Sequence, residues 1–179
     1  VEGMEKTGAG FPQSHIDAEK MVTLGESAHK FAGLESINIP FDLAIEAEAM
    51  GCKVDLRDAN EHIPEIIESP FFDDIESVDL CDDFLSNGRI PVVAEACQIG
   101  REKYPDVPLV SGQIGPFTLL GQIVGIEYLM KCLATKPEAV KEGINICADA
   151  VIEVVKAYNE LDVQGDCMYE PSVAADLLP

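Results

Sequence analysis

Apolar residues repeat with helical spacing most clearly between residues 137 and 161. Val140, Ile144 and Cys147 are separated by steps of four and three, which gives a helix beginning at Pro137 one apolar face. The pattern predicts a long helix that packs against a sheet rather than a coiled coil. Other helices are predicted over residues 17–32, 42–50, 117–123 and 125–134, with a short helical turn and then a helix after Pro91 within residues 80–104.

Short apolar runs between these helices have the length and composition of strands. Residues 1–14 are rich in glycine and are predicted to be irregular, while the acidic segment 57–79 shows no clear periodicity. Because strands alternate with helices, the sequence predicts β-α-β units, a parallel sheet and an α/β fold. The predicted strands are residues 35–39, 52–56, 107–111 and 165–169.

The pattern also predicts that the chain is the front portion of a larger barrel. A new strand begins at Gly165, a polar turn follows at Glu170-Pro171-Ser172, and the sequence ends at Pro179. A parallel sheet that stopped there would keep an unpaired edge and an uncovered face. We therefore expect residues 1–179 to form the N-terminal part of a single domain, with part of any active site supplied from outside them.

Composition and charge exclude several classes of protein. Hydrophobic residues make up 47% and charged residues 25% of the chain, and no apolar run approaches the ~18 residues of a membrane span. The net charge of −21 argues against nucleic-acid binding, which needs clustered Lys and Arg. The six cysteines form no C-x-x-C pair, so buried free thiols and a reducing cytoplasm are predicted.

Candidate chemistry lies where the predicted strands end, because ligands of parallel β/α folds bind at the carboxyl ends of strands. Asp42 follows the first strand and either caps a helix or handles a cationic, protic or hydroxylated ligand group. The turn at residues 112–116 is either an ordinary connection or an approach of backbone N–H groups to an anion. Glu170 is either a solvated loop carboxylate or a group that takes a proton or orients a metal ligand.

The histidines and the familiar nucleotide and hydrolase motifs add little. His15, His29 and His62 lack zinc-helix spacing, which favours surface or capping roles for them. Neither G-x-S-x-G, a phosphate-binding P-loop nor G-x-G-x-x-G occurs in the sequence. These absences weaken hydrolase, nucleotide and dinucleotide assignments.

Four segments together resemble the uroporphyrinogen decarboxylase superfamily, and within it the methylcobamide:coenzyme M methyltransferases of methanogenic archaea. The resemblance runs from about residue 10 to the end of the chain. The segments are IPFDLAIEAEAMGC at 39–52, GRIPVV at 88–93, GPFTL at 115–119 and EPSVAADLL at 170–178.

This resemblance implies a (β/α)8 TIM barrel that moves a methyl group from a methylated corrinoid protein to the thiol of coenzyme M. Zinc would activate that thiol as a thiolate, with ligands in the back half of the barrel and none in this chain. Asp42 and Glu170 would be catalytic, with Glu170 near the metal. Gln113, Gly115 and Ser172 would help to bind the substrate.

Other functions stay open within the resemblance. Asp42 matches the position of the catalytic aspartate of the decarboxylase branch, so a decarboxylase-like enzyme is the main alternative, together with a corrinoid methyltransferase that uses another acceptor such as a folate. Against the decarboxylase, Gln122 replaces a tyrosine of that branch and an arginine-rich loop has no counterpart near the start. The third alternative is a binding or regulatory half-barrel without catalysis.

Overall fold

The computed structural model describes residues 2–57 and 63–173, and it contains a sheet of three parallel strands. These strands are β1 (Ile37–Ile39), β4 (Leu109–Ile114) and β5 (Gly165–Tyr169), in the order β1-β4-β5. Ile37 pairs with Leu109, and Val110 pairs with Gly165. All three carboxyl ends therefore lie at the same end of the sheet.

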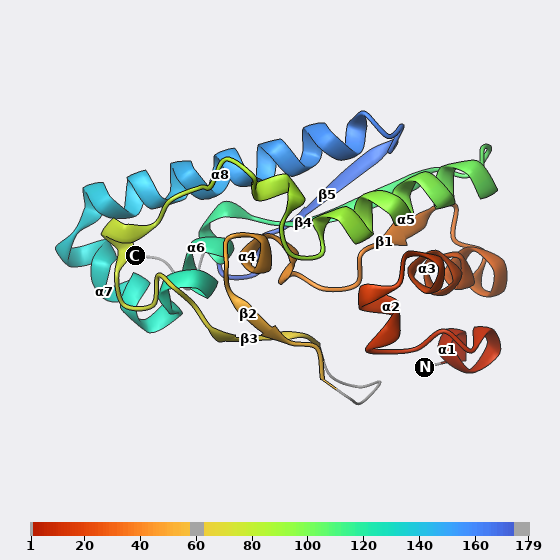
Figure 1. Ribbon diagram of the computed structural model, residues 1–179, viewed down its shortest axis with the longest axis horizontal. Coiled ribbons are helices and arrows are strands. Elements are labelled where there is room, and N and C mark those ends of the chain that lie inside the picture. Colours follow the sequence, from red (N-terminus) through yellow and green to blue (C-terminus); the bar gives the residue numbers. More distant parts are fainter. Residues whose placement is uncertain (1, 58–62, 174–179) are drawn as a thin grey trace.

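Three helices cover one face of this sheet: α3 (Ala18–Ala32), α5 (Ile90–Lys103) and α8 (Pro137–Asn159). Figure 1 shows α5 and α8 running along the strands. Leu109 and Ile39 are at most 1% exposed beneath the helices. Gly25 allows α3 to approach closely, because a Cβ there would lie 2.9 Å from Ile39 Cγ2. The sheet and these helices thus form one continuous hydrophobic core.

A second, antiparallel pair of strands lies apart from the parallel sheet. The strands β2 (Lys53–Asp55) and β3 (Glu65–Glu68) pair with each other alone among the described residues. Figure 1 shows this hairpin on the side of the molecule opposite α8. The remaining elements are α1 (Glu2–Thr7), α2 (Gln13–Ile16), α4 (Ile45–Ala49), η1 (Ile75–Ser77), η2 (Phe84–Ser86), α6 (Pro116–Val124) and α7 (Ile126–Thr135).

The long helices and the last strand agree with the sequence prediction, but several shorter elements differ from it. Residues 1–14, predicted to be irregular, contain α1 and the start of α2. The aperiodic segment 57–79 contains β3, whose pairing with β2 is antiparallel instead of parallel. Strand β4 continues to Ile114, so residues 112–114 are strand rather than turn. The strand β3 and the longer β4 arise where pairing with another segment overrides a weak local signal.

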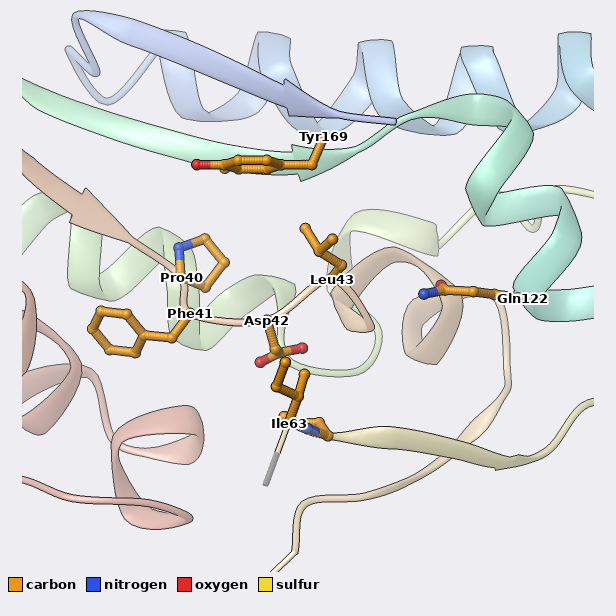
Figure 2. Close-up of a pocket in the computed structure, with 9 residues that line it drawn as sticks. Pro40, Phe41, Asp42, Leu43, Ile63, Gln122 and Tyr169 are labelled. Atoms are coloured by element: carbon orange, nitrogen blue, oxygen red, sulfur yellow. The ribbon is translucent and has the colours of Figure 1, made fainter. Parts of the chain in front are cut away.

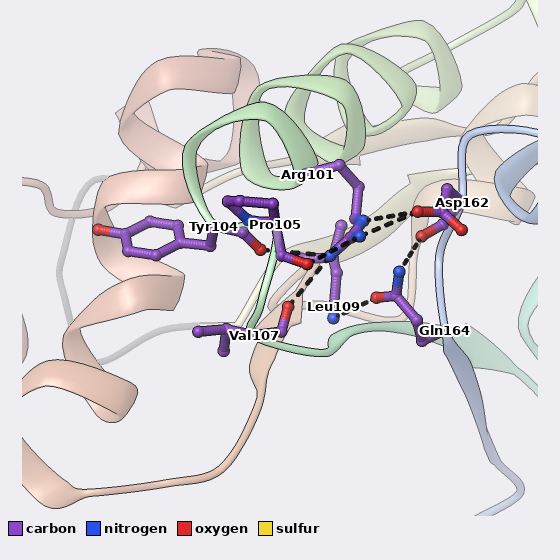
Figure 3. Close-up of polar contacts among 7 residues, drawn as sticks. All are labelled: Arg101, Tyr104, Pro105, Val107, Leu109, Asp162 and Gln164. Atoms are coloured by element: carbon purple, nitrogen blue, oxygen red, sulfur yellow. Dashed lines mark hydrogen bonds and ion pairs between the residues drawn. The ribbon is translucent and has the colours of Figure 1, made fainter.

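Arg101 closes the end of the sheet opposite the carboxyl ends (Figure 3). Its guanidinium donates to the carbonyl oxygens of Tyr104 and Val107, each at 3.2 Å, and to Asp162 Oδ2 at 2.9 Å. The side chain thereby satisfies carbonyl groups left free beyond the end of α5 and ties α5 to the loop before β5. Polar residues at this end serve the fold and lie far from the candidate site.

The cysteines and the helices bear on two further predictions. All six thiols are free, and Cys52, Cys97, Cys132 and Cys147 are buried. Cys81, however, is exposed on the loop before η2, and Cys167 is only partly covered, so burial does not hold for these two. Among the described residues, only α6 and α7 taken together reach the length and hydrophobicity of a membrane span, and they are bent by 107°.

Candidate active site at the carboxyl ends of the strands

A cavity of about 440 Å³ opens where β1, β4 and β5 end. Figure 2 shows Tyr169 on one wall, Pro40, Phe41 and Leu43 on another, and Ile63 opposite Tyr169. The walls are mostly apolar, and the polar side chains among them are Asp42, Gln122 and Tyr169. The lining residues are Pro40, Phe41, Asp42, Leu43, Ile63, Pro64, Gly112, Gln122 and Tyr169.

Asp42 stands at this cavity with its carboxylate held by the chain itself. Arg89 donates from Nη1 to Asp42 Oδ2 at 2.8 Å and from Nη2 to Oδ1 at 3.2 Å. His15 Nδ1 lies 2.9 Å from Oδ2, and the Ala44 N–H donates to Oδ1 at 3.0 Å. Both oxygens thus have two contacts each, and the carboxylate joins β1 to α5 and α2.

The charge on Asp42 is stabilised despite its burial. Burial acts to raise the pKa of Asp42, but the hydrogen bond with His15 and the positive charge of Arg89 outweigh it and lower the pKa to about 2. Arg89 is shared, because its Nε donates to Glu48 Oε2 at 2.6 Å. Asp42 is therefore an anion whose charge is already matched, and it keeps little capacity for a cationic ligand.

His15 is a residue of this site that sequence reasoning missed. It was expected at the surface or at a helix end, yet it is 1% exposed and Phe11 stacks on its ring at 4.2 Å between centroids. The contact with Asp42 brings together two segments that local patterns cannot relate. His29 takes the predicted capping role, with Nδ1 2.6 Å from the Leu34 carbonyl oxygen. His62 lies outside the described residues.

Glu170 closes over the N-terminus of α6. Its carboxylate accepts from the Phe117 N–H at 3.2 Å and from the Thr118 N–H at 2.7 Å, and the Thr118 hydroxyl also donates to it. The helix N-terminus that could have bound an external anion therefore binds this side chain. A Cβ on Gly115 would overlap the Glu170 carboxylate, so glycine at that position permits the contact.

The three predicted substrate-binding residues do not line the cavity. Gln113 is 1% exposed and donates to Ser111 Oγ at 2.7 Å. The Gly115 N–H donates to the Tyr169 carbonyl oxygen at 2.7 Å, and the Ser172 N–H donates to Thr118 Oγ1 at 3.1 Å. The structure thus brings Asp42 to the cavity, whereas Gly115, Glu170 and Ser172 gather at the start of α6.

Glu46 is a second buried acid that the sequence did not single out. It lies on α4, is 2% exposed, and faces the backbone N–H of Ile114. Burial raises the pKa of Glu46 to about 7, and the nearby charge of Asp42 acts in the same direction. The site thus holds one acid that is ionised near neutral pH and another that is half protonated there.

Within the described residues, no group of three or more His, Cys, Asp or Glu side chains is arranged to hold a metal ion. Asp42 is held by Arg89, and Glu170 is held by the N–H groups at the start of α6, so both carboxylates already have protein partners. These residues therefore do not fit a zinc site.

The parallel strands, the crossover helices and the cavity at the strand ends are the features of a β/α-barrel enzyme, whose active site lies at the carboxyl ends of its strands. The whole chain, residues 1–179, matches the family described as uroporphyrinogen decarboxylase (URO-D). The chain belongs to that family.

Relatives within this family carry a narrower name. The chain is 32% identical to a protein of Methanosarcina barkeri named methylcobamide:CoM methyltransferase MtaA, over 99% of this chain and 52% of the relative. It is 34% identical to methylcobamide:CoM methyltransferase MtbA of Methanosarcina acetivorans, again over 99% and 52%. The chain spans about half the length of these curated relatives.

A solved methyltransferase from Methanosarcina mazei shares the fold. It superposes with a TM-score of 0.94 at 33% identity and covers 99% of this chain and 52% of that chain. The predicted fold class, α/β and the N-terminal portion of a (β/α)8 TIM barrel, is thereby confirmed, and so is the resemblance to methylcobamide:CoM methyltransferases.

Proposed function

We propose that the protein transfers a methyl group from a methylated corrinoid, carried by a partner protein, to the thiol of coenzyme M. The observation that carries the proposal is the apolar cavity at the ends of β1, β4 and β5, on a chain whose relatives are named for this reaction. A cytoplasmic location belongs to the same proposal.

The transfer itself needs an environment that favours a thiolate and excludes water. The thiolate sulfur attacks the methyl carbon, a C–S bond forms, and the Co–C bond breaks with its electron pair remaining on cobalt. The proton of the thiol leaves to a base or to solvent before the attack. The apolar walls at Pro40, Phe41 and Leu43 would strengthen the nucleophile by removing water from it.

The catalytic roles of Asp42 and Glu170 stay predictions. The contacts of these two residues support a role in positioning the segments around the cavity. Asp42 fixes the loop that carries Pro40 and Phe41, while Glu170 fixes the end of β5 against α6. Substrate binding by Gln113, Gly115 and Ser172 also stays a prediction. Zinc would lower the pKa of the thiol, and we propose that its ligands lie outside the described residues.

The same cavity argues against the decarboxylase alternative. A porphyrinogen substrate of that branch carries many carboxylates and needs cationic partners. No Lys or Arg is among the described residues that line the cavity, and the nearby Arg89 is paired with Asp42 and Glu48. A folate acceptor is compatible with the apolar walls, so only an assay of the methylated product distinguishes a folate from a thiol acceptor.

A product assay on the full-length protein decides among these functions. We expect S-methylation of 2-mercaptoethanesulfonate in the presence of methylcobalamin, with cob(I)alamin formed in equal amount. Tetrahydrofolate should not be methylated, and uroporphyrinogen III should not lose carbon dioxide. Decarboxylation, or methylation of the folate alone, would contradict the proposal. No turnover of any substrate would favour a non-catalytic role.

A further inference from the structure

Two further hollows follow the cavity at the strand ends in succession, and the three together are called the trough. Gln122 lines both the cavity and a second hollow of about 440 Å³, which Ile67 and Phe72 also border. Phe72 in turn lines a third hollow of about 350 Å³ beside Ile126. Three hollows that share wall residues thus run from the parallel sheet past β3 to the corner between α6 and α7.

Exposed apolar side chains form the rim of this trough. Ile63 is 73% exposed, Phe72 63%, Ile67 49% and Ile126 45%. Large apolar side chains gathered along one groove are unusual on a surface that faces only water. Their arrangement indicates a surface that is covered in the full-length protein, and a large apolar ligand would cover it.

The rim is held in place by hydrogen bonds to α6. Ser69 Oγ donates to the Ile123 carbonyl oxygen at 2.5 Å, and the Asp73 N–H donates to the Val124 carbonyl oxygen at 3.1 Å. The ring of Phe72 rests against Gly125, where a Cβ would lie 3.0 Å from it. A ligand that binds here therefore meets a preformed shelf and does not have to order it.

Gln122 is the polar group at the centre of the trough. It projects from α6, and Figure 2 shows its amide end directed toward Leu43 across the cavity. Its Oε1 is buried and has no hydrogen-bond partner among the described residues. Charged side chains also border the trough, with Glu68 at the second hollow and Lys131 at the third. Gln122 is therefore a neutral amide shared by the cavity and the second hollow, both of which apolar side chains also line.

We propose that this trough is the binding site of the cobamide ring. Phe72 and Ile67 would lie against the apolar face of the ring, and Gln122 would pair with a carboxamide on the edge of the ring. This inference rests on the proposed function and adds where the donor lies. A cobamide has a broad apolar ring fringed with carboxamides, which matches a long apolar groove around a buried amide. The methyl group would then point into the cavity beneath Tyr169.

Other occupants match the trough less well. The two-carbon thiol of coenzyme M is far too small to fill three hollows and would occupy the cavity alone. A second copy of this chain would have to bring its own strongly acidic surface, at a net charge of −21, against Glu68, Asp73 and Glu127. A neutral ring with amide edges meets no such repulsion.

Titration of methylcobalamin into the full-length protein tests the proposed cobamide-binding site. Phe72→Ser removes the shelf and should weaken binding about tenfold, and Gln122→Ala should weaken it by a similar factor. Ile152→Ser is the matched control, because Ile152 is 47% exposed on α8 and borders none of the three hollows. This variant should bind methylcobalamin within about twofold of wild type. The KM for 2-mercaptoethanesulfonate should stay unchanged in Phe72→Ser and Ile152→Ser, because neither residue lines the cavity at the strand ends.

The proposed site would be wrong if Phe72→Ser and Gln122→Ala both bind methylcobalamin with wild-type affinity. It would also be wrong if Ile152→Ser weakens binding as much as they do. Absence of methylcobalamin binding by the wild-type protein would overturn it as well. The proposed function fails separately. If the protein binds methylcobalamin through Phe72 and Gln122 but never methylates the thiol, the binding site stands and the methyl-transfer reaction is contradicted.

Discussion

Replacing Arg89 with methionine is expected to lower the free energy of unfolding by about 3–5 kcal/mol, because it leaves a buried carboxylate without its main partner. The side chain of Arg89 is 5% exposed and that of Asp42 is 0% exposed, so water cannot replace the lost contacts. Methionine keeps much of the volume, which separates loss of charge from loss of packing. Denaturant unfolding at pH 7 measures the effect.

A double variant provides the control for this experiment. Asp42→Asn combined with Arg89→Met removes the buried negative charge together with its partner and should recover a large part of the lost stability. If the single variant Arg89→Met unfolds at the wild-type denaturant concentration, the ion pair does not hold β1 against α5. If the double variant is less stable than the single one by the full cost of Asp42→Asn, the two residues act independently.

Replacing Glu46 with glutamine is expected to stabilise the protein by about 3 kcal/mol at pH 8 and by little at pH 4.5. The pKa of Glu46 is raised from 4.5 to about 7, and each unit corresponds to about 1.4 kcal/mol. The folded state therefore binds the proton more tightly than the unfolded chain does. As pH rises from about 4.5 to 7 the wild-type protein loses stability through this group, and above pH 7 the loss is complete.

The comparison across pH isolates this carboxyl from other groups. Every other titrating side chain is shared by wild type and Glu46→Gln, so the difference between their unfolding free energies reports Glu46. A constant difference between pH 4.5 and 8 would mean that Glu46 ionises normally in the folded protein.

Local patterns in the sequence predicted the elements that have a strong period or a clear boundary. The apolar stripe of α8 and the strand at Gly165–Tyr169 needed no knowledge of distant contacts. By contrast, β3 is formed by pairing with β2, and the four-residue helix α2 by packing on α3. Such elements depend on tertiary contacts, which a window of sequence does not contain.

The candidate site follows the same division. The rule that ligands bind at strand ends placed Asp42 at the cavity. It could not supply His15 or Arg89, which are separated from Asp42 along the chain and approach it only after folding. It also could not show that Glu170 occupies the N-terminus of α6, because a carboxylate near such an end can bind it or face a ligand.

The polar residues around the cavity have a common consequence for the proposed reaction. Asp42 and Arg89 pair with each other, Glu170 accepts from the backbone at the start of α6, and most of the cavity wall is left to apolar side chains. A mainly apolar wall suits a methyl group that moves between cobalt and sulfur, because apolar side chains bind neither the cobalt nor the thiolate. The charged groups then serve to fix the positions of β1, β5 and α6.

A crystal structure of the full-length protein with methylcobalamin tests this account most directly. The cobalt-bound methyl group should lie in the cavity bounded by Pro40, Gly112 and Tyr169, with the corrin ring extending over Phe72. A cobalamin bound away from the carboxyl ends of β1, β4 and β5, with that cavity left to solvent, would contradict it.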